Sequence, residues 1–277
     1  MHEIDCTDET FDPNFTTEYE LSIQLGLDGF SFCILDDIRK KYLLLKHYPF
    51  LLSNNLFLYR KVTEIIAKEE ILRKPYKKKH ISFATTGFTA IPQAFDKDDE
   101  QDIFSFNFDR TKDEALTSFN DNIFNAKILF AYPVKVYRLL CTDDNHPAPV
   151  HPSGFLLHEA SRGTMSGNQT LIWASTRFFI ILIIKEGKLS LLNSYRYTNN
   201  MDFIFYLLNV FKSEGISTKE ASVRLAGDID ENSHLAGFIK NRFRSFAFLK
   251  LNKDFQYSYT FSVFPAHWFS SVINFRE

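Results

Sequence analysis

The sequence predicts an α/β protein with two related domains, each made of three meandering strands, a helix and a further strand, facing each other across a cleft. Residues 19–85 and 169–227 show the same order of strand and helix patterns. The length of 277 residues, with 45% apolar and 24% charged residues, suits two folded domains that each bury a core. The repeated order therefore predicts a duplicated βββαβ module, with chance recurrence as the alternative.

The first unit opens with a β-hairpin. Its three strand patterns follow one another at about 20–27, 30–36 and 41–48. Asp28-Gly29 lies between the first two and is the commonest composition for a two-residue hairpin turn. A Ser53/Asn54 capping signal then opens a helix with apolar residues at helical spacing. After this helix, "KKHISFATT" predicts a fourth strand that crosses back into the same sheet.

The second unit repeats this order. From Gln169 onward, three strand patterns follow one another. They are separated by a turn at Ala174–Arg177 and by a Glu186-Gly187 turn. An Asn199-Asn200 cap opens a helix that runs to about Phe211, and "EASVRLAG" predicts the strand after it.

The remaining segments lie outside the two units. The acidic N-terminus has no periodicity and is expected to be a loose arm, whereas prolines and glycines between the units predict a linker with a short helix. Pro265 suits the start of a final amphipathic helix with Trp268, Val272 and Phe275 on one face. The chain should thus divide into arm, first domain, linker, second domain and a C-terminal helix packing back on the first domain, at residues 1–17, 18–145, 146–168, 169–264 and 265–277.

Charge and cysteine content favour a cytoplasmic protein. The net charge is only −2, so no global field attracts nucleic acid or an anionic membrane. Cys6, Cys33 and Cys141 form no CxxC pair, which fits a reducing compartment. The N-terminus does not have the pattern of a secretory signal, and the longest apolar run stops at Lys185, well short of the ~20 residues that cross a bilayer. No membrane insertion is expected.

Three stretches resemble an uncharacterised bacterial protein family with the actin-like ATPase (ribonuclease H-like) fold. They are "YELSIQLGLDGFSFCILD", "HISFATTGFTAIPQAF" and "TLIWASTRFFIILIIKEGKLSLLNSYRY". A tandem of βββαβ modules is also the organisation of actin, sugar kinases, heat-shock chaperones and the actin-like proteins of pilus and type II secretion assembly. The resemblance implies this fold and an interdomain cleft, but the family supplies no established activity.

In active members of this superfold, paired hairpins hold the phosphates of ATP, and an acidic residue orders Mg²⁺. The resemblance places the corresponding positions at Asp28, Gly29, Ser175, Thr176 and Gly227. The second hairpin, "WASTRFFII", lacks the acid and the glycines that let backbone amides approach a phosphate, and its Arg177 is expected to be solvated. We therefore expect a vestigial nucleotide cleft with no cofactor and no catalytic residue. The alternative is an ATPase or phosphotransferase that binds ATP and Mg²⁺ there.

Two polar clusters are candidates for other sites. His146, His151, His158 and Glu159 crowd the linker, but their spacing matches no metal-ligand pattern, so a water-exposed connector without metal is expected. The basic run Arg73–His80 is interpreted as a solvated loop, and no nucleic-acid partner is expected. Nucleotide-binding and hydrolase motifs such as GxxxxGK[ST], GxGxxG, GxSxG and HExxH are absent.

These observations predict a non-catalytic, degenerate actin-like protein that acts as a protein-interaction scaffold. The chain has 30 Phe residues, which predict a Phe-rich core, with an aromatic binding surface as the alternative. Phe88, Ile91 and Phe95 lie beside an acidic loop in Thr85–Asp109, where Pro and Gly suggest irregular, partly exposed backbone. We expect these three residues to contact a partner. The alternative is that they cover the edge of the first sheet.

Overall fold

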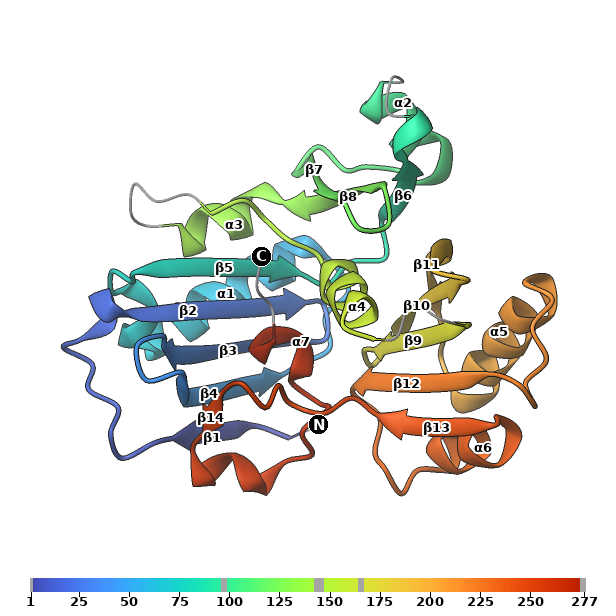
Figure 1. Ribbon diagram of the computed structural model, residues 1–277. Helices are drawn as coiled ribbons and strands as arrows, with labels where there is room; N and C mark the ends of the chain where they lie inside the picture. The colour runs from blue at the N-terminus through green and yellow to red at the C-terminus, as the bar shows by residue number, and fades with distance from the viewer. Residues whose placement is uncertain (1, 96–98, 142–146, 164–166, 275–277) are drawn as a thin grey trace.

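The computed structural model describes residues 2–95, 99–141, 147–163 and 167–274. Two large β-sheets lie side by side, and a smaller sheet lies across one end of the molecule (Figure 1). Helices α4 (Pro152–Ser161) and α7 (Ser270–Ile273) lie in the central region between the large sheets. No helix within the described ranges is long and apolar enough to cross a lipid bilayer.

The first sheet contains the first predicted unit and receives both ends of the chain. Its elements are β1 (Ile4–Thr7), β2 (Tyr19–Gly26), β3 (Gly29–Asp36), β4 (Lys41–Pro49), β5 (Lys78–Phe83), β14 (Gln256–Tyr257) and, between β4 and β5, helix α1 (Asn55–Lys68). The order is β1-β4-β3-β2-β5, and β14 also pairs with β4. β2, β3 and β4 are antiparallel, whereas β5 returns parallel to β2.

The second sheet repeats this arrangement. Its elements are β9 (Gln169–Ala174), β10 (Phe178–Lys185), β11 (Lys188–Arg196), helix α5 (Asn200–Ser213), β12 (Ser222–Gly227) and β13 (Ser245–Phe248), and the strand order is β11-β10-β9-β12-β13. β12 returns parallel to β9, as β5 does to β2. The side chains of Asn54 and Asn199 cap α1 and α5 in the same way. The predicted duplication of a βββαβ module is therefore correct.

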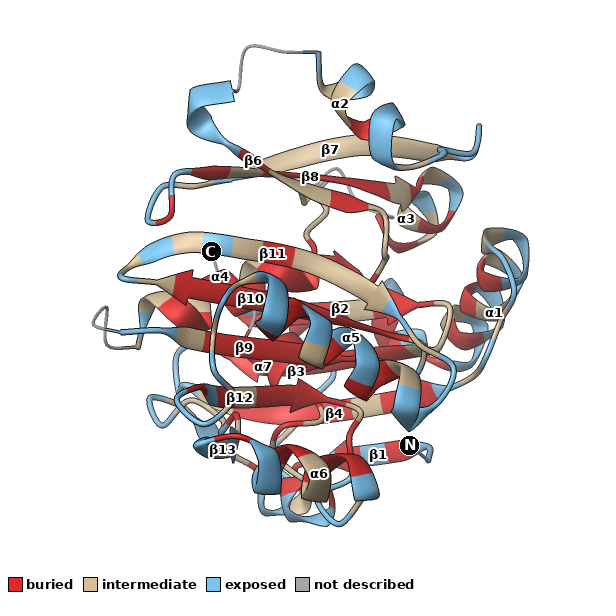
Figure 2. Ribbon diagram, turned by 90° about the vertical axis from the view of Figure 1, so that its right-hand side faces the viewer, coloured by how far each residue is buried: buried red, intermediate tan, exposed pale blue. Residues whose placement is uncertain are grey.

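Each large sheet is covered on both faces. Helices α1 and α3 (Val134–Leu140) pack on the first sheet, and α5 and α6 (His234–Arg242) pack on the second. The opposite faces are covered by the C-terminal residues 261–273 and by α4, respectively. All residues of β10 from Phe178 to Ile184 are consequently buried (red in Figure 2), which explains the continuous apolar run in that strand.

The third sheet was not predicted. It consists of β6 (Phe88–Pro92), β7 (Glu114–Asp121) and β8 (Ala126–Pro133) in the order β6-β8-β7, with helix α2 (Glu100–Asn107) packed on one face. The expectation of irregular backbone over Thr85–Asp109 is wrong there, because β8 supplies a pairing strand from later in the chain. Phe88 pairs with Phe130 at the start of this ladder. Local sequence patterns do not report such distant partners.

Both termini differ from the prediction. Residues 4–7 of the expected loose arm form β1, which pairs antiparallel with β4 and buries Ile4 and Cys6. The expected helix from Pro265 is reduced to the four residues of α7, because preceding backbone groups bond to the second sheet: Gly227 N–H donates to His267 O. Phe275 lies outside the described residues. The segment that precedes α7 packs on the first sheet, together with β1.

Candidate functional site between the two hairpins

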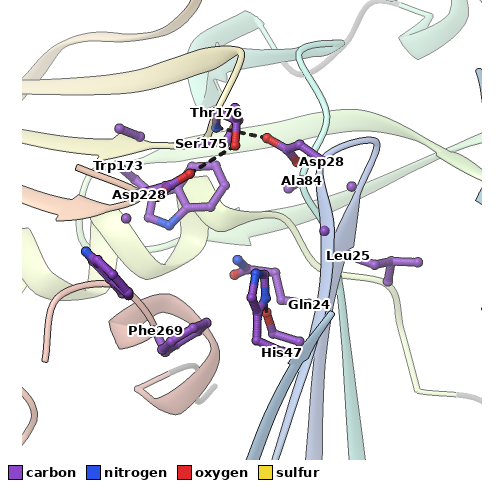
Figure 3. A pocket seen from close by; sticks show the side chains of 16 residues that line it. Gln24, Leu25, Asp28, His47, Ala84, Trp173, Ser175, Thr176, Asp228 and Phe269 are labelled. Carbon is purple, nitrogen blue, oxygen red and sulfur yellow. Dashed lines mark hydrogen bonds between the residues drawn. The ribbon is translucent and has the colours of Figure 1, made fainter. Parts of the chain in front are cut away.

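A small cavity lies where the β2–β3 hairpin of the first sheet meets the β9–β10 hairpin of the second. Its volume is about 40 Å³, compared with roughly 10–15 Å³ for one water molecule. The residues predicted from the resemblance all line it, namely Asp28, Gly29, Ser175, Thr176 and Gly227 (Figure 3). The sequence therefore identified residues that the fold brings together, although they lie almost 200 residues apart at the extremes.

Asp28 makes a direct contact between the two hairpins. Its Oδ2 accepts a hydrogen bond from the backbone N–H of Thr176 at 3.0 Å, and the Ser175 side chain is a further hydrogen-bonding partner. Burial is the main cause that raises the pKa of Asp28, and the nearby Asp228 carboxylate adds to it. The carboxyl group thus already accepts a hydrogen bond from a backbone N–H that a bound phosphate would need as a donor. We refer to the Asp28–Thr176 hydrogen bond as the hairpin contact.

Two further bonds hold the second hairpin. Thr176 Oγ1 donates to Asp228 Oδ2 at 3.0 Å, so the two carboxyl groups approach this turn from either side (Figure 3). Arg177 Nη1 donates to the carbonyl oxygen of Leu52, in the loop before α1, at 2.7 Å. The expectation that Arg177 is merely solvated is therefore wrong, because its guanidinium group reaches the first domain.

Gly227 ends β12 in a conformation that requires glycine. Its φ is +92°, and an added Cβ would lie 1.9 Å from the carbonyl oxygen of Ala174. Its N–H donates to His267 O at 2.8 Å. The amide expected to face a nucleotide is thus bonded to the C-terminal segment, which also places Trp268 and Phe269 in the cavity wall.

His47 and Gln24 form the part of the cavity that the sequence did not reveal. His47 lies opposite Ser31 in the β3–β4 ladder and shares a 2.8 Å hydrogen bond with its hydroxyl through Nδ1. Burial lowers the pKa of His47 to about 4. His47 Nε2 and Gln24 Oε1 have no hydrogen-bond partner among the described residues (Figure 3). A Cβ on Gly29 would lie 3.0 Å from the His47 imidazole, so a larger residue at this turn would press on that ring.

The cavity does not fit a nucleotide. Its only charged lining residues among those described are the carboxylates Asp28 and Asp228, and no Lys or Arg lines it. Phosphate groups are usually held by cationic side chains and free backbone amides. Here the charges are negative, and the amides of Thr176 and Gly227 already have partners within the chain. A small polar solute or water matches the space better.

The three predicted interaction residues do not form one exposed surface. Phe88 and Ile91 are 2% and 5% exposed, and they pack in the clusters on opposite faces of the third sheet. Only Phe95, at 63% exposure, is accessible. The expectation that Phe88 and Ile91 are partly exposed is therefore wrong, because β6 pairs with β8 and both of its faces are covered.

His151 is fully buried at the start of α4, so the linker is not a water-exposed connector there. His151 caps the helix, because its Nδ1 accepts the N–H of Ser153 at 3.2 Å. Its Nε2 is 3.0 Å from the carbonyl oxygen of Thr85 and donates to it. The imidazole packs between Phe88 and Phe130, and burial lowers its pKa to about 4. These contacts assign His151 a structural role.

The other polar candidates are also distributed within the fold. His158 and Glu159 lie on α4, and His146 lies outside the described residues. Within the part of the chain that the structure describes, no group of three or more His, Cys, Asp or Glu residues could hold a metal ion. The end of the basic run is buried, since Lys79 and His80 belong to β5, so the predicted solvated loop is wrong there.

Comparison with known proteins agrees with this architecture. A protein of unknown function with an actin-like ATPase fold from Bacteroides thetaiotaomicron superposes with a TM-score of 0.76 and 22% identity, covering 87% of this chain and 94% of that one. A chain of the PilM–PilN type IV pilus biogenesis complex gives a TM-score of 0.56 at 8% identity, covering 93% and 97%. No curated protein sequence matches the chain. The fold is thus that of the actin-like ATPases. Residues 8–246 match the family described as "Protein of unknown function (DUF3822)", and the chain belongs to that family.

Proposed function

We propose that this protein is a non-catalytic, actin-like scaffold that binds a protein partner in the cytoplasm. The observation that carries the proposal is the hairpin contact, in which the Asp28 carboxyl group accepts the N–H of Thr176. This bond joins the two hairpins between which an active member of the fold would bind phosphates. A carboxylate at that place repels a phosphate and withholds an amide donor from it.

Three further features support this proposal. The cavity between the hairpins measures about 40 Å³, whereas small-molecule pockets usually measure ~300–1,000 Å³. PilM, which has the same fold, occurs in a complex with another pilus biogenesis protein, so a body of this shape is compatible with binding a protein. Within the described part of the chain, no disulfide bond joins Cys6, Cys33 and Cys141, and disulfides are rare in a reducing compartment.

The alternative is an ATPase or phosphotransferase that opens its cleft to bind ATP and Mg²⁺. One observation favours it: Asp28, Gly29, Ser175, Thr176 and Gly227 converge on a single cavity. Opening would have to break the hairpin contact and the bond of Arg177 to Leu52 O, and it would expose no cationic side chain from the cavity wall. We therefore place this alternative second.

A thermal-unfolding experiment with Mg-ATP separates the two functions. A ligand present at 100 times its dissociation constant stabilises the native state by ~2.7 kcal/mol. We expect the same melting temperature with Mg-ATP as with Mg²⁺ alone, for both the wild type and Asp28→Ala. A shift of several degrees in the wild type that Asp28→Ala abolishes would overturn the scaffold proposal and restore the enzyme.

A further inference from the structure

We propose that the free edge of β7 is a docking site for an extended, basic segment of a partner protein, which adds to the third sheet as a fourth strand. This inference rests on the proposed scaffold function and specifies its surface and the chemistry of its partner. The third sheet extends across one end of the molecule, away from the cavity between the hairpins (Figures 1 and 2).

Hydrogen bonds on both sides of β8 define which backbone groups of β7 face outward. Ala131 N–H donates to Gly87 O, so odd-numbered residues of β8 bond to β6. Even-numbered residues then face β7, in agreement with the bond from Val134 N–H to Asp113 O. In the β7–β8 register, residues 115, 117, 119 and 121 of β7 lie opposite those even-numbered residues. The backbone N–H and C=O groups of the even-numbered residues of β7 therefore point outward, away from β8.

The outward groups form a continuous row. The N–H and C=O groups of Leu116, Ser118 and Asn120 point away from β8, and within the described part of the chain no strand pairs with this edge. Every residue of β7 is at least partly exposed (Figure 2). An added strand could bond to all three residues, because such groups recur every second residue along an edge.

Between its two terminal acidic residues, Glu114 and Asp121, β7 does not carry the features that usually protect an edge strand. Such edges commonly have a lysine, a proline, a β-bulge or a very short strand. β7 has eight residues, "EALTSFND", without Lys or Pro, and pairs with β8 without a register shift. Its central residues Thr117 and Phe119 favour strand conformation. The strand is therefore long and regular enough to accept another strand.

Charge identifies the occupant as basic. Residues 99–121 contain seven acidic and two basic residues. Lys127 pairs with Glu100, and Lys135 pairs with Asp113, which leaves an excess of negative charge. Glu114 and Asp121 stand at the two ends of β7 itself. A partner strand with Lys or Arg near both ends would pair with this pattern, since opposite charges on adjacent strands are favourable.

The same charges disfavour a second copy of this chain. If β7 paired antiparallel with β7 of another copy about its centre, Asp113 and Glu114 of one strand would lie close to Asp121 of the other. Like charges at such positions destabilise strand pairing. A basic segment from a different protein has no such repulsion.

The test uses phage-displayed random peptides of about twelve residues, long enough to pair along the whole strand. The selected peptides are measured against purified protein by fluorescence anisotropy. We expect Lys- and Arg-rich peptides that bind the wild type and lose about tenfold or more in affinity with Ser118→Pro. This proline removes an outward N–H and no bond to β8. Ser118→Ala is the matched control, because it also loses the side-chain bond to Glu100 but keeps the N–H.

A second pair of variants covers the case in which Ser118→Pro disturbs the sheet. Asn120→Lys adds a positive charge at the exposed edge and should also weaken binding about tenfold, whereas Asn241→Lys on α6 should not. Binding should also slow hydrogen exchange at the amides of Leu116, Ser118 and Asn120. The inference is overturned if no basic peptide is selected, or if the selected peptides bind Ser118→Pro and Asn120→Lys as tightly as the wild type. Stabilisation by Mg-ATP would instead contradict the scaffold function itself.

Discussion

The carboxylate of Asp28 and the backbone N–H of Thr176 join two hairpins that begin the two halves of a duplicated fold. The bond places an acidic side chain from the first half against the turn of the second. Because Asp228 approaches the same threonine, two carboxylates share one turn. This geometry leads to a first prediction on stability and its pH dependence.

Two substitutions of Asp28 should distinguish the contribution of its hydrogen bond to stability from the contribution of its charge. Asp28→Ala removes the acceptor and should lower the free energy of unfolding by about 1–2 kcal/mol. Asp28→Asn keeps an acceptor oxygen and should be close to wild type. The pKa of Asp28 is raised in the folded state. The stability that Asp28 contributes through this shift is therefore fully present below its pKa in the unfolded chain, and it is lost as pH rises through its pKa in the folded protein.

The free energy of unfolding of Asp28→Asn should therefore increase relative to that of the wild type from acidic to neutral pH. Urea unfolding of the wild type and both variants at pH 4 and pH 7 measures this. If Asp28→Asn is as destabilised as Asp28→Ala at both pH values, the carboxylate is favourable and the interpretation of the site is wrong.

Gly227 should tolerate no side chain. In Gly227→Ala the new methyl group would meet Ala174 O at 1.9 Å with φ at +92°, so backbone must shift in two strands. We expect a loss of at least ~3 kcal/mol or a failure to fold. Gly237→Ala is the control, because that glycine lies within α6 with no atom inside 4 Å of the added Cβ. It should be neutral or stabilising by up to ~1 kcal/mol in urea unfolding. Equal behaviour of the two variants would contradict the close approach at Gly227.

Local signals explain what the sequence predicted of the fold. The Asp28-Gly29 and Glu186-Gly187 turns, the apolar patterns of the strands they join and the Asn54 and Asn199 caps are all encoded within a few residues. The βββαβ order could therefore be predicted twice and recognised as a repeat. β1 and β6 were missed because their partners, β4 and β8, are distant in sequence and the segments themselves are short.

The same distinction holds for the candidate site. Hairpin residues were found because a turn can be located from sequence, and the resemblance to actin-like ATPases then implies that the two turns face each other. His47 was not found because its position depends on the register that sets it opposite Ser31. The bond between Arg177 and Leu52 O was missed for a related reason: its acceptor is a backbone atom, which has no residue-specific signal.

Acid should destabilise the protein through His151. Its folded pKa of about 4 lies below the ordinary value near 6.5, so the unfolded chain binds a proton first. The stability it contributes is complete above pH 6.5 and is lost as pH falls toward 4, by an amount on the order of 3 kcal/mol. His47, also with a pKa of about 4, should act in the same direction.

A substitution that keeps the cap isolates the His151 contribution. Asn can accept the Ser153 N–H but does not titrate, so His151→Asn should flatten the dependence of unfolding free energy on pH between 4 and 6.5. Some stability at neutral pH will be lost with the ring packing. His234→Asn, at an exposed position, is the control and should keep the wild-type slope. An unchanged slope in His151→Asn would show that this residue does not cause the acid sensitivity.

A buried hydrogen bond attaches the C-terminal segment to the second sheet. Trp173 on β9 donates its indole N–H to Ser271 Oγ on α7 at 2.9 Å, and both side chains are buried. Ser271→Ala leaves that N–H without an acceptor and should cost about 1–3 kcal/mol. Trp173→Phe removes the donor and some packing. In Trp173→Phe/Ser271→Ala no polar group is orphaned, so the double variant should lose less than the sum of the two single losses. Chemical unfolding of all four proteins gives the coupling directly, and additive losses would mean that α7 is held on β9 by apolar packing alone.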